Sequence, residues 1–383
     1  MDQKRILFLT ASRADYGKMK PLMKAVEVHP DLNCSIAVTG MHLVPHYGLT
    51  AAQIFRDGFS DIHPFTNQNP GKTGRRDHIV ADTIRGLSSI LEKVQPDMLV
   101  IHGDRPETLA GAIAGSFNLV LTAHMEGGEI SGTIDEIIRH AVTKLAHIHF
   151  ASTNDAQRRL LQLGEIEGSI HVIGSPDIDI MLSDGLPCLD EVKDHYNIPF
   201  SSYIILVYHP VAFERDNLRD RVRMIMDVIA SSGRSCVAIY PNNEPGADDI
   251  IDAYKHYHDA SWFRCLPSMR FEFFLTLLRH ADGIVGNSSC GIHEAPVFGV
   301  PTINLGTRQR NRFSYAGIAN IGENPDQLGN ALTGLKHCEK IKTLHFGDGS
   351  SCSRFISVLT KGEVWKTPVE KQFRDLAIWS RNE

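Results

Sequence analysis

A short polar turn, Gly286-Asn-Ser-Ser-Cys-Gly291, separates an apolar strand-like run from a helical stretch predicted over Ile292–Phe298. A strand–turn–helix arrangement directs backbone N–H groups and the positive end of the helix dipole at an anion. Ser288 and Ser289 add hydroxyl donors, and the glycines, Gly291 included, let a phosphate approach the backbone closely. The turn therefore predicts a phosphate site. The alternative interpretation is an ordinary helix cap, for which Ser and Asn are favoured residues.

Three charged residues extend this hypothesis. Glu294 lies one turn into the predicted helix, where its carboxylate can accept hydrogen bonds from ribose hydroxyls or simply complement the helix dipole. Arg13 and Lys18 follow the first strand and can both point at one anion, or form a solvated surface pair. Their segment matches neither GxGxxG nor GxxxxGK[ST], so dinucleotide cofactors and P-loop chemistry lose support.

Acidic residues follow neighbouring strands in the first half of the chain. Asp104 and Arg105 come directly after the strand Met98–His102, Glu126 follows the next strand, and Asp135 comes shortly after. Crowded carboxylates tend to have separated pKa values, so one site can supply both an acid and a base. The sequence therefore predicts an acid–base centre, with surface salt bridging as the alternative.

Polar residues also follow strands in the second half. His209 comes after Tyr203–Tyr208 and can bind an anion or transfer protons near neutral pH, although lone histidines are commonly structural. Asn242 and Arg270 stand in further strand-end loops, where either can contact a base or a sugar. No metal-ligand spacing, GxSxG elbow or Cys–His nucleophile signature is present, so we expect no metal site.

Short apolar runs alternate with amphipathic stretches along the chain, a pattern typical of parallel sheets covered by helices on both faces. We predict two doubly wound Rossmann-like domains with an interdomain cleft, 1–183 and 184–365, joined through a linker at Asp184–Pro199. In such sheets ligands bind at the carboxyl ends of the strands. The predicted strands are Arg5–Thr10, Cys34–Thr39, Met98–His102, Leu119–His124, Ile148–Ser152, His171–Gly174, Tyr203–Tyr208, Cys236–Tyr240, Trp262–Cys265, Gly283–Val285 and Thr302–Leu305.

Composition limits the function further. The 383 residues are 42% hydrophobic and 22% charged, which is typical of a globular protein. A net charge of −6 argues against nucleic-acid binding. Seven cysteines without a CxxC motif indicate reduced thiols, and no apolar run reaches the roughly 20 residues of a membrane span, so we expect a cytoplasmic protein without a membrane partner.

Several motifs together resemble the hydrolysing UDP-N-acetylglucosamine 2-epimerases of sialic-acid biosynthesis, which include bacterial capsule enzymes and the epimerase half of the bifunctional animal enzyme. The matching segments stand in family order over most of the chain. They are SRADYGK (12–18), VTGMH (38–42), IHGDR (101–105), HMEGGEISGTIDEIIRHAVTKLAHIH (124–149), GSPDID (174–179), YHPV (208–211), YPNN (240–243), VGNSSCGIHEAP (285–296) and INLGTRQRNR (303–312).

The resemblance implies a GT-B fold with a C-terminal helix, 366–383, packed on the first domain. It implies conversion of UDP-N-acetylglucosamine and water to N-acetylmannosamine and UDP, by a homodimer that needs no cofactor. Asp104, Glu126 and Asp135 fall on acid–base positions and His209 on an essential histidine. The implied UDP ligands are Ser288, Ser289, Glu294 and Arg13, and Arg308 matches a site arginine of open function. His293 departs from several relatives, which carry Arg there.

Other functions remain open at this stage. The same reaction on UDP-N,N'-diacetylbacillosamine, in the legionaminic-acid pathway, would alter only the pocket around C4 and C6 of the sugar. A non-hydrolysing epimerase would lack the SGTIDE and GTRQ segments. A GT-B glycosyltransferase would need an acceptor groove, and a nucleotide-sugar sensor would not need the carboxylates.

Overall fold

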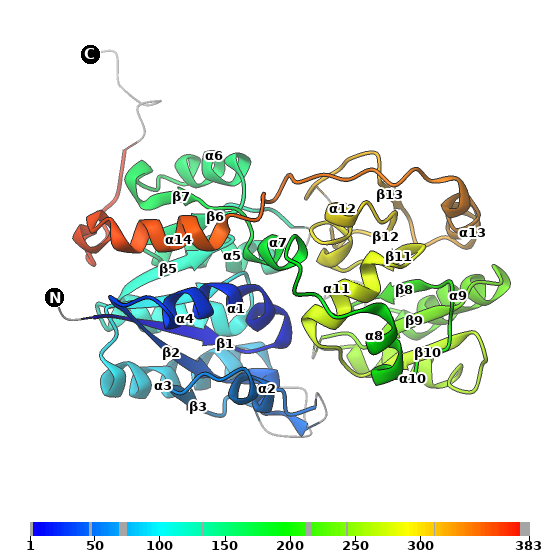
Figure 1. The fold of residues 1–383 in the computed structure, drawn as a ribbon, viewed down its shortest axis with the longest axis horizontal. Helices are drawn as coiled ribbons and strands as arrows, with labels where there is room; N and C mark the ends of the chain where they lie inside the picture. The colour runs from blue at the N-terminus through cyan, green and yellow to red at the C-terminus, as the bar shows by residue number, and fades with distance from the viewer. Residues whose placement is uncertain are drawn as a thin grey trace, which may run out of the picture. The chain divides into compact units, whose positions relative to one another are not determined.

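The computed structural model describes residues 3–45, 48–68, 75–131, 134–211, 216–242, 244–309 and 311–375. The chain forms two compact units (Figure 1). The first contains Met1–Glu129, Asp135–Leu182 and His345–Glu383, and the second contains Ile130–Ile134 and Ser183–Leu344. The two predicted Rossmann-like sheets are both present, one in each unit.

The first sheet has seven parallel strands in the order β3-β2-β1-β4-β5-β6-β7. Its order reverses between β1 and β4, and ligands bind at such switch points, beside the carboxyl ends of the strands. The strands are β1 (Lys4–Thr10), β2 (Leu32–Val38), β3 (Ile62–Pro64), β4 (Met98–His102), β5 (Leu121–Met125), β6 (Ile148–Ala151) and β7 (Ile170–Val172). The helices of this unit are α1 (Arg13–Glu27), α2 (Ala51–Arg56), α3 (Arg76–Val94), α4 (Pro106–Phe117), α5 (Ile134–Leu145), α6 (Asn154–Gln162), α7 (Pro176–Met181) and α14 (Ser351–Thr360).

Helices cover both faces of this sheet because successive side chains of a strand point in opposite directions. Phe8 of β1 belongs to the core beneath α1 and α14, and its ring lies 6.4 Å from that of Phe355. The adjacent Leu9 faces α4, where a Cβ built on Gly111 would lie 2.8 Å from its Cδ2 atom. Both faces are therefore buried, which explains why the strands are continuous apolar runs.

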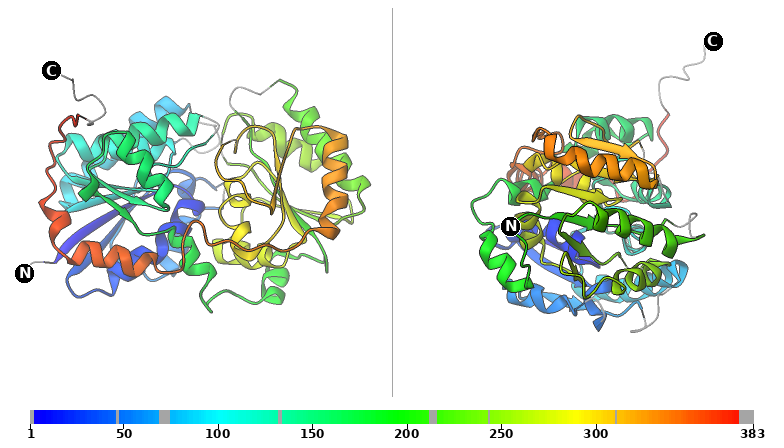
Figure 2. Two further views of the ribbon diagram at one scale, coloured as in Figure 1. Left: turned by 90° about the horizontal axis from the view of Figure 1, so that it is seen from above. Right: turned by 90° about the vertical axis from the view of Figure 1, so that its right-hand side faces the viewer.

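The helix that returns to the first unit is α14, which packs beside α1 and α7 (Figures 1 and 2). We predicted this helix at 366–383 and placed 345–365 in the second domain. Phe355 and Leu359 explain the difference, because they stand one helical turn apart and both enter the first core. Residues 367–375 contain no helix, and 376–383 lie outside the described residues.

The segment that follows α14 contacts the first unit at Glu165, whose carboxylate is buried. That carboxylate is paired with Lys371, with Lys144 at 2.7 Å and with His149 Nε2 at 2.9 Å. Arg374 also donates to its backbone oxygen at 2.8 Å. Burial alone would raise the pKa of Glu165, but His149 and the two lysines lower it to about 2.

We expect Glu165 to make the protein sensitive to acid. Its folded pKa lies below the unfolded value, so its stabilising effect is present above about pH 4.5 and disappears as the pH falls towards 2. Glu165→Gln should lower the free energy of unfolding at pH 7 by about 2 kcal/mol. The difference from wild type should shrink as the pH falls in thermal melts recorded between pH 7 and 3. Glu370→Gln, at an exposed position, is the control, and a constant difference would contradict the role of Glu165.

The second sheet has six parallel strands in the order β10-β9-β8-β11-β12-β13, and its order reverses between β8 and β11. The strands are β8 (Ile204–Val207), β9 (Cys236–Ile239), β10 (Phe263–Leu266), β11 (Gly283–Gly286), β12 (Thr302–Leu305) and β13 (Ile318–Ile321). The helices are α8 (Leu189–Tyr196), α9 (Leu218–Ser231), α10 (Ala247–Lys255), α11 (Phe271–Arg279), α12 (Ala295–Phe298) and α13 (Pro325–Gly334). A core of apolar side chains from β8 and β9 packs against α9 and α10.

The predicted elements need two corrections. β3 and β13 were not predicted, because they are edge strands of three and four residues with few buried side chains. α1 begins at Arg13, because Ser12 and Asp15 form a capping box at its start. The predicted linker contains α8, whose buried Val192 makes it part of the second unit.

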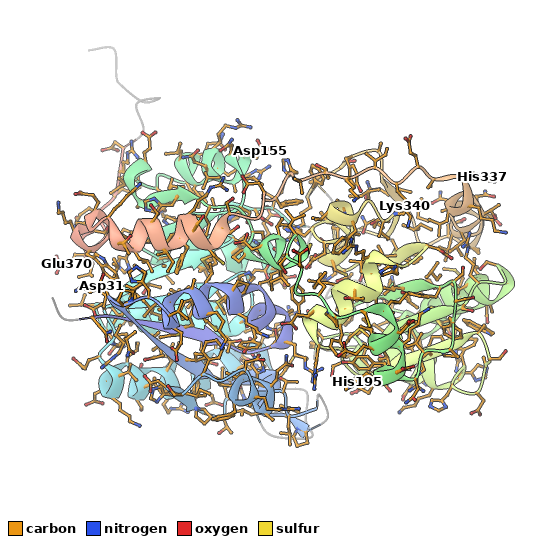
Figure 3. The ribbon with its side chains drawn as sticks, in the orientation of Figure 1. Asp31, Asp155, His195, His337, Lys340 and Glu370 are labelled. Carbon is orange, nitrogen blue, oxygen red and sulfur yellow. The ribbon has the colours of Figure 1, made fainter. Side chains whose placement is uncertain are left out.

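Many of the polar and charged side chains lie on the outside of each unit. Exposed examples are Asp31 and Glu370 in the first unit and His337 and Lys340 in the second (Figure 3). In the described part of the chain, no helix is both long enough and apolar enough to cross a bilayer.

Candidate active site

Glu126 follows β5 at the switch-point edge of the first sheet, and its backbone is strained. Its φ of 60° lies in the left-handed region, which non-glycine residues rarely adopt. Its N–H donates to Phe150 O at 3.1 Å, and its side chain is only 5% exposed. Strain of this kind persists where the surrounding structure holds it, and it clusters at functional sites.

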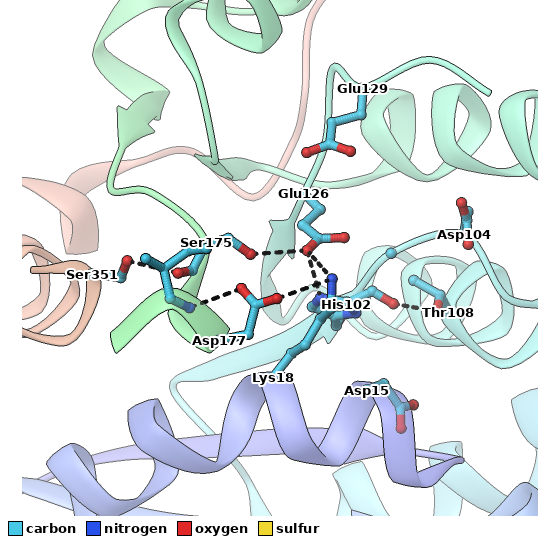
Figure 4. Close-up of polar contacts among 12 residues, drawn as sticks. Asp15, Lys18, His102, Asp104, Thr108, Glu126, Glu129, Ser175, Asp177 and Ser351 are labelled. Atoms are coloured by element: carbon cyan, nitrogen blue, oxygen red, sulfur yellow. Dashed lines mark hydrogen bonds and ion pairs between the residues drawn. The ribbon is translucent and has the colours of Figure 1, made fainter. Parts of the chain in front are cut away.

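Three groups converge on one carboxylate oxygen of Glu126 (Figure 4). Lys18 Nζ lies 3.0 Å from Oε1, Ser175 Oγ donates to it at 3.2 Å, and His102 Nε2 lies 3.4 Å away. The Lys18 ammonium also lies 3.6 Å from Asp177 Oδ2. These contacts hold the carboxylate in one orientation. They also place Lys18 beside two carboxylates, and its predicted contact with an anion of the substrate stays a prediction.

A buried arginine joins the predicted carboxylates. Arg139 of α5 is ion-paired with Asp104, donates to Glu126 O at 2.9 Å and lies 3.9 Å from Glu129 Oε2. Burial opposes its charge, but Asp104, Glu129, Glu126 and Asp135 together raise the pKa of Arg139. All three predicted acid–base residues therefore lie close enough to one guanidinium to raise its pKa. The sequence predicted that these carboxylates would lie close together, and in the structure they surround Arg139.

Four members of this cluster were not among the predicted site residues, although two of them, His102 and Arg139, stand close to the predicted carboxylates in the sequence. His102, Arg139, Ser175 and Asp177 stood in the quoted motifs but were not singled out as site residues. The segment after β7 places Ser175 and Asp177 beside Glu126, about fifty positions away in the sequence. Only the strand order brings these segments together, although a Gly-Ser-Pro-Asp sequence directly after a strand was a usable signal.

Two neighbouring histidines are structural. Burial lowers the pKa of His124 to about 3 and that of His42 to about 4, so both rings are neutral at physiological pH. His124 Nε2 contacts Gly103 O at 2.8 Å, and His42 Nε2 contacts Thr10 Oγ1 at 3.0 Å. The first contact supports the turn that carries Asp104.

Two predicted arginine ligands stand at helix starts of the first unit. Arg13 is the first residue of α1, and Arg105 is the N-cap of α4. Arg105 Nε lies 3.4 Å from Glu107 Oε2, and its guanidinium contacts Met41 Sδ at 3.8 Å. Both arginines follow switch-point strands, where an anion is expected to bind.

In the second unit, His209 is hydrogen-bonded to Asn287 of the turn that follows β11. Its N–H donates to Asn287 Oδ1 at 2.7 Å, and Asn287 Nδ2 donates back to His209 O at 2.8 Å. The N–H of Asn242 donates to His209 Nδ1 at 3.2 Å. Because Nδ1 accepts, the neutral ring carries its proton on Nε2, which can donate to a ligand.

The Gly286–Gly291 turn has the predicted position but a different continuation. Its last three residues form a 3-10 turn (Ser289–Gly291), and the one-turn helix α12 begins only at Ala295, because Pro296 has no N–H to continue a longer helix. Glu294 is consequently the N-cap of α12 and not a residue one turn into a helix. The capping alternative is also realised, since Ser288 Oγ accepts from Cys290 N at 3.4 Å.

The remaining predicted ligands are Arg308, which contacts this turn, and Arg270, which stands at the start of α11. Arg308 Nη1 and Gln309 Nε2 donate to Asn287 O at 3.2 and 3.0 Å. Arg270 is the N-cap of α11, and its guanidinium lies over the Phe273 ring at 5.4 Å. Gln309, which anchors the turn, was not predicted as a site residue.

Gly286 is required by the close approach of two strands. Its φ is 135°, and an added Cβ would lie 2.0 Å from Val207 O. Gly286→Ala should therefore destabilise the second unit by about 3 kcal/mol through strain and overlap. Urea unfolding tests this expectation. Gly334→Ala is the control, because Gly334 has a helical φ of −63° and open space at its Cβ; that change should stay within about 1 kcal/mol of wild type. Equal stabilities of the two variants would contradict this explanation.

Two Rossmann-type sheets with polar clusters at their switch points define a GT-B protein, which confirms the predicted fold class. The predicted acid–base residues follow strands of the first sheet, and the Gly286–Gly291 turn follows β11 of the second sheet. The family model for UDP-N-acetylglucosamine 2-epimerase matches residues 24–360, and the chain belongs to that family. The resemblance predicted from the motifs is thereby confirmed.

Individual relatives agree with this assignment. UDP-N-acetylglucosamine 2-epimerase of Neisseria meningitidis serogroup B is 41% identical over 379 residues, covering 98% of this chain and all of the relative. The hydrolysing UDP-N,N'-diacetylbacillosamine 2-epimerase of Legionella pneumophila is 32% identical, covering 93% and 95%. The structure of UDP-GlcNAc 2-epimerase from Methanocaldococcus jannaschii in complex with UDP-GlcNAc and UDP shares the fold, with a TM-score of 0.80 at 21% identity over 94% of this chain and all of that one.

Proposed function

We propose that this protein is a hydrolysing UDP-N-acetylglucosamine 2-epimerase, which converts UDP-N-acetylglucosamine and water to N-acetylmannosamine and UDP for sialic-acid or capsule synthesis. The observation that carries the proposal is the buried Arg139, which holds Asp104 and the backbone of Glu126 in one cluster. Fixed carboxylates suit proton transfer at a sugar carbon. The 41% identity to an enzyme of that name supports the same substrate.

The reaction begins at the bond between C1 and the diphosphate oxygen. No carbonyl flanks C2 of the sugar, so its proton is barely acidic until C1 becomes electron-poor. Donors that stabilise UDP as it leaves with the bonding electrons therefore act where charge develops. We assign the stabilisation of the departing UDP to four groups, namely Ser288, Ser289, Arg13 and the Nε2–H of His209. We assign the binding of the ribose hydroxyls to Glu294.

Proton transfer completes the epimerisation. One carboxylate among Asp104, Glu126 and Asp135 removes the C2 proton, which leaves a C1–C2 double bond in the sugar. Water then adds its hydroxyl to C1 and a proton returns to C2 from the opposite face, assisted by a second carboxylate. No hydride moves, so the chemistry calls for no nicotinamide.

The reaction in deuterated water tests this sequence. NMR of the product should show deuterium at C2 and free UDP in equal amount. N-acetylmannosamine that retains the original C2 proton would contradict the elimination step. A UDP-sugar product without free UDP would contradict hydrolysis.

A second candidate substrate is UDP-N,N'-diacetylbacillosamine, on which the Legionella relative is named to act. Incubation of the enzyme with each sugar nucleotide separates the two activities. Release of UDP from the diacetylbacillosamine compound alone would replace our first proposal.

We further propose that the enzyme is a homodimer in the cytoplasm. Phe117, the last residue of α4, and Leu119, two residues before β5, are 80% and 59% exposed, and together they offer an apolar surface that a second copy can cover. All seven cysteines are free thiols, as a reducing compartment favours. Light scattering should give twice the 42.6 kDa mass of the chain, and Phe117→Asp should shift the species towards monomer.

A further inference from the structure

Asp177, the second residue of α7, has a buried carboxylate to which the proposed reaction gives no role. Its side chain is fully buried. Oδ1 accepts from the adjacent N–H of Ile178 at 3.1 Å, and in the portions of the chain that the structure describes no hydrogen bond reaches Oδ2. Burying an ionised carboxylate is costly unless a cation offsets its charge, and the Lys18 ammonium, 3.6 Å from Oδ2, supplies that cation.

The Lys18 ammonium stands between two carboxylates (Figure 4). Its Nζ lies 3.0 Å from Glu126 Oε1 and 3.6 Å from Asp177 Oδ2. One positive and two negative charges leave this group of three side chains with a net charge of −1. Glu126 can therefore take up a proton while Asp177 continues to balance the buried ammonium.

A lysine paired with a single carboxylate would have the opposite effect. An adjacent cation favours the ionised form of a carboxylate, and protonation of that carboxylate would leave the buried ammonium less well compensated. Such a carboxylate is a weak base. In this cluster the negative charge of Asp177 offsets the effect of Lys18, so Glu126 keeps the basicity that removal of a proton from carbon requires.

The two aspartates of α7 have different surroundings. Asp179 accepts from the N–H groups of Ser351 and Cys352 at 3.0 and 2.8 Å, so its carboxylate caps the start of α14. The carboxylate of Asp177 instead faces Lys18. The packing of α7 against α1 and α14 keeps both side chains in these positions.

His102 and Arg139 also face Glu126. His102 Nε2, on β4, lies 3.4 Å from Oε1, and Arg139, on α5, donates to the carbonyl oxygen of Glu126 at 2.9 Å. The Arg139 guanidinium is itself paired with Asp104. These groups are the same in the wild type and in a variant of Asp177, so a difference between the two proteins in the titration of Glu126 reports the charge of Asp177.

We propose that Asp177 is a positioning residue for proton transfer, which acts through Lys18 and enables Glu126 to accept the proton from the sugar. The inference rests on the proposed function and deepens it. Among the three carboxylates that can remove the C2 proton, it gives that role to Glu126.

Titration of Glu126 in the full-length protein tests the proposal without substrate. Glutamate labelled with carbon-13 at its side-chain carboxyl carbon is followed by NMR, and the Glu126 signal is the one missing from Glu126→Gln. Asp177→Asn should move the titration midpoint to lower pH by about one unit, because a nearby negative charge is lost. Lys18→Gln should move it to higher pH, because the ammonium is lost. Loosened packing would shift both variants in the same direction.

Asp179→Asn is the matched control, because it changes the other aspartate of α7. It should weaken the cap of α14 and leave the midpoint in place. An unchanged or higher midpoint in Asp177→Asn would overturn the inference, as would an equal shift in Asp179→Asn. If Asp177→Asn does not fold, the double variant Lys18→Gln/Asp177→Asn is compared with Lys18→Gln, and the same decrease in the midpoint is required.

Activity provides a second readout. Asp177→Asn should lower the turnover of UDP-N-acetylglucosamine about three- to tenfold with little change in KM, because the proton acceptor is a weaker base. Wild-type turnover in spite of a shifted midpoint would also overturn the inference, since the basicity of Glu126 would then not limit proton removal. Absence of UDP release from the wild type would instead refute the proposed function, and the titration would still decide whether Asp177 controls the protonation of Glu126.

Discussion

Replacing Glu126 with glutamine should reduce the turnover of UDP-N-acetylglucosamine by about 10³-fold, within the range that general acid–base catalysis supplies. The amide keeps the shape of the side chain and can still accept from Ser175 at the same position. It cannot accept a proton from carbon. UDP should bind with nearly unchanged affinity, because the proposed diphosphate ligands stand elsewhere.

The measurement is UDP release by the purified variant, together with its Kd for UDP. Glu363→Gln is the matched control, since Glu363 belongs to the first unit, is exposed and pairs only with Lys366 in the described structure. Control turnover should equal that of the wild type. Near-normal turnover in Glu126→Gln would remove Glu126 from the proton-transfer step.

Arg139→Met should destabilise the protein by about 3–5 kcal/mol, because removal of one partner leaves buried charges uncompensated. Arg139 is 1% exposed and lies among Asp104, Glu126, Glu129 and Asp135. Methionine fills similar volume but supplies no charge. Activity should also fall, since Asp104 and the backbone of Glu126 lose their common donor.

Chemical denaturation of Arg139→Met measures the first effect. Arg158→Met is the control: Arg158 pairs with Asp155 at the surface, where its side chain is 69% exposed, and its loss should cost less than about 0.5 kcal/mol. If the two variants had the same stability, Arg139 would not be the centre of the cluster. Arg139→Lys keeps the positive charge but lacks the planar guanidinium. It should therefore recover part of the stability but not the orientation of Asp104 and of the Glu126 backbone.

The sequence by itself determined the fold class and most elements. Continuous apolar runs such as Met98–His102 and Thr302–Leu305 predicted parallel strands buried on both faces, with the observed bounds. The phosphate turn and the acid–base residues also stood out, because polar residues directly after apolar strands must gather at one edge of a parallel sheet. These predictions depend on local pattern and chain order, which a sequence contains.

Only the tertiary structure decided which residues complete the clusters. Ser175 and Asp177 reach Glu126 because β5, β6 and β7 are neighbours in one sheet, and Lys18 joins them from α1. No local pattern encodes such contacts, since they follow from strand order and helix packing. The position of the returning helix was decided in the same way, by the fit of Phe355 into the first core. The sequence therefore determined which functional groups stand at each strand end. Packing decided which of these groups come into contact with one another.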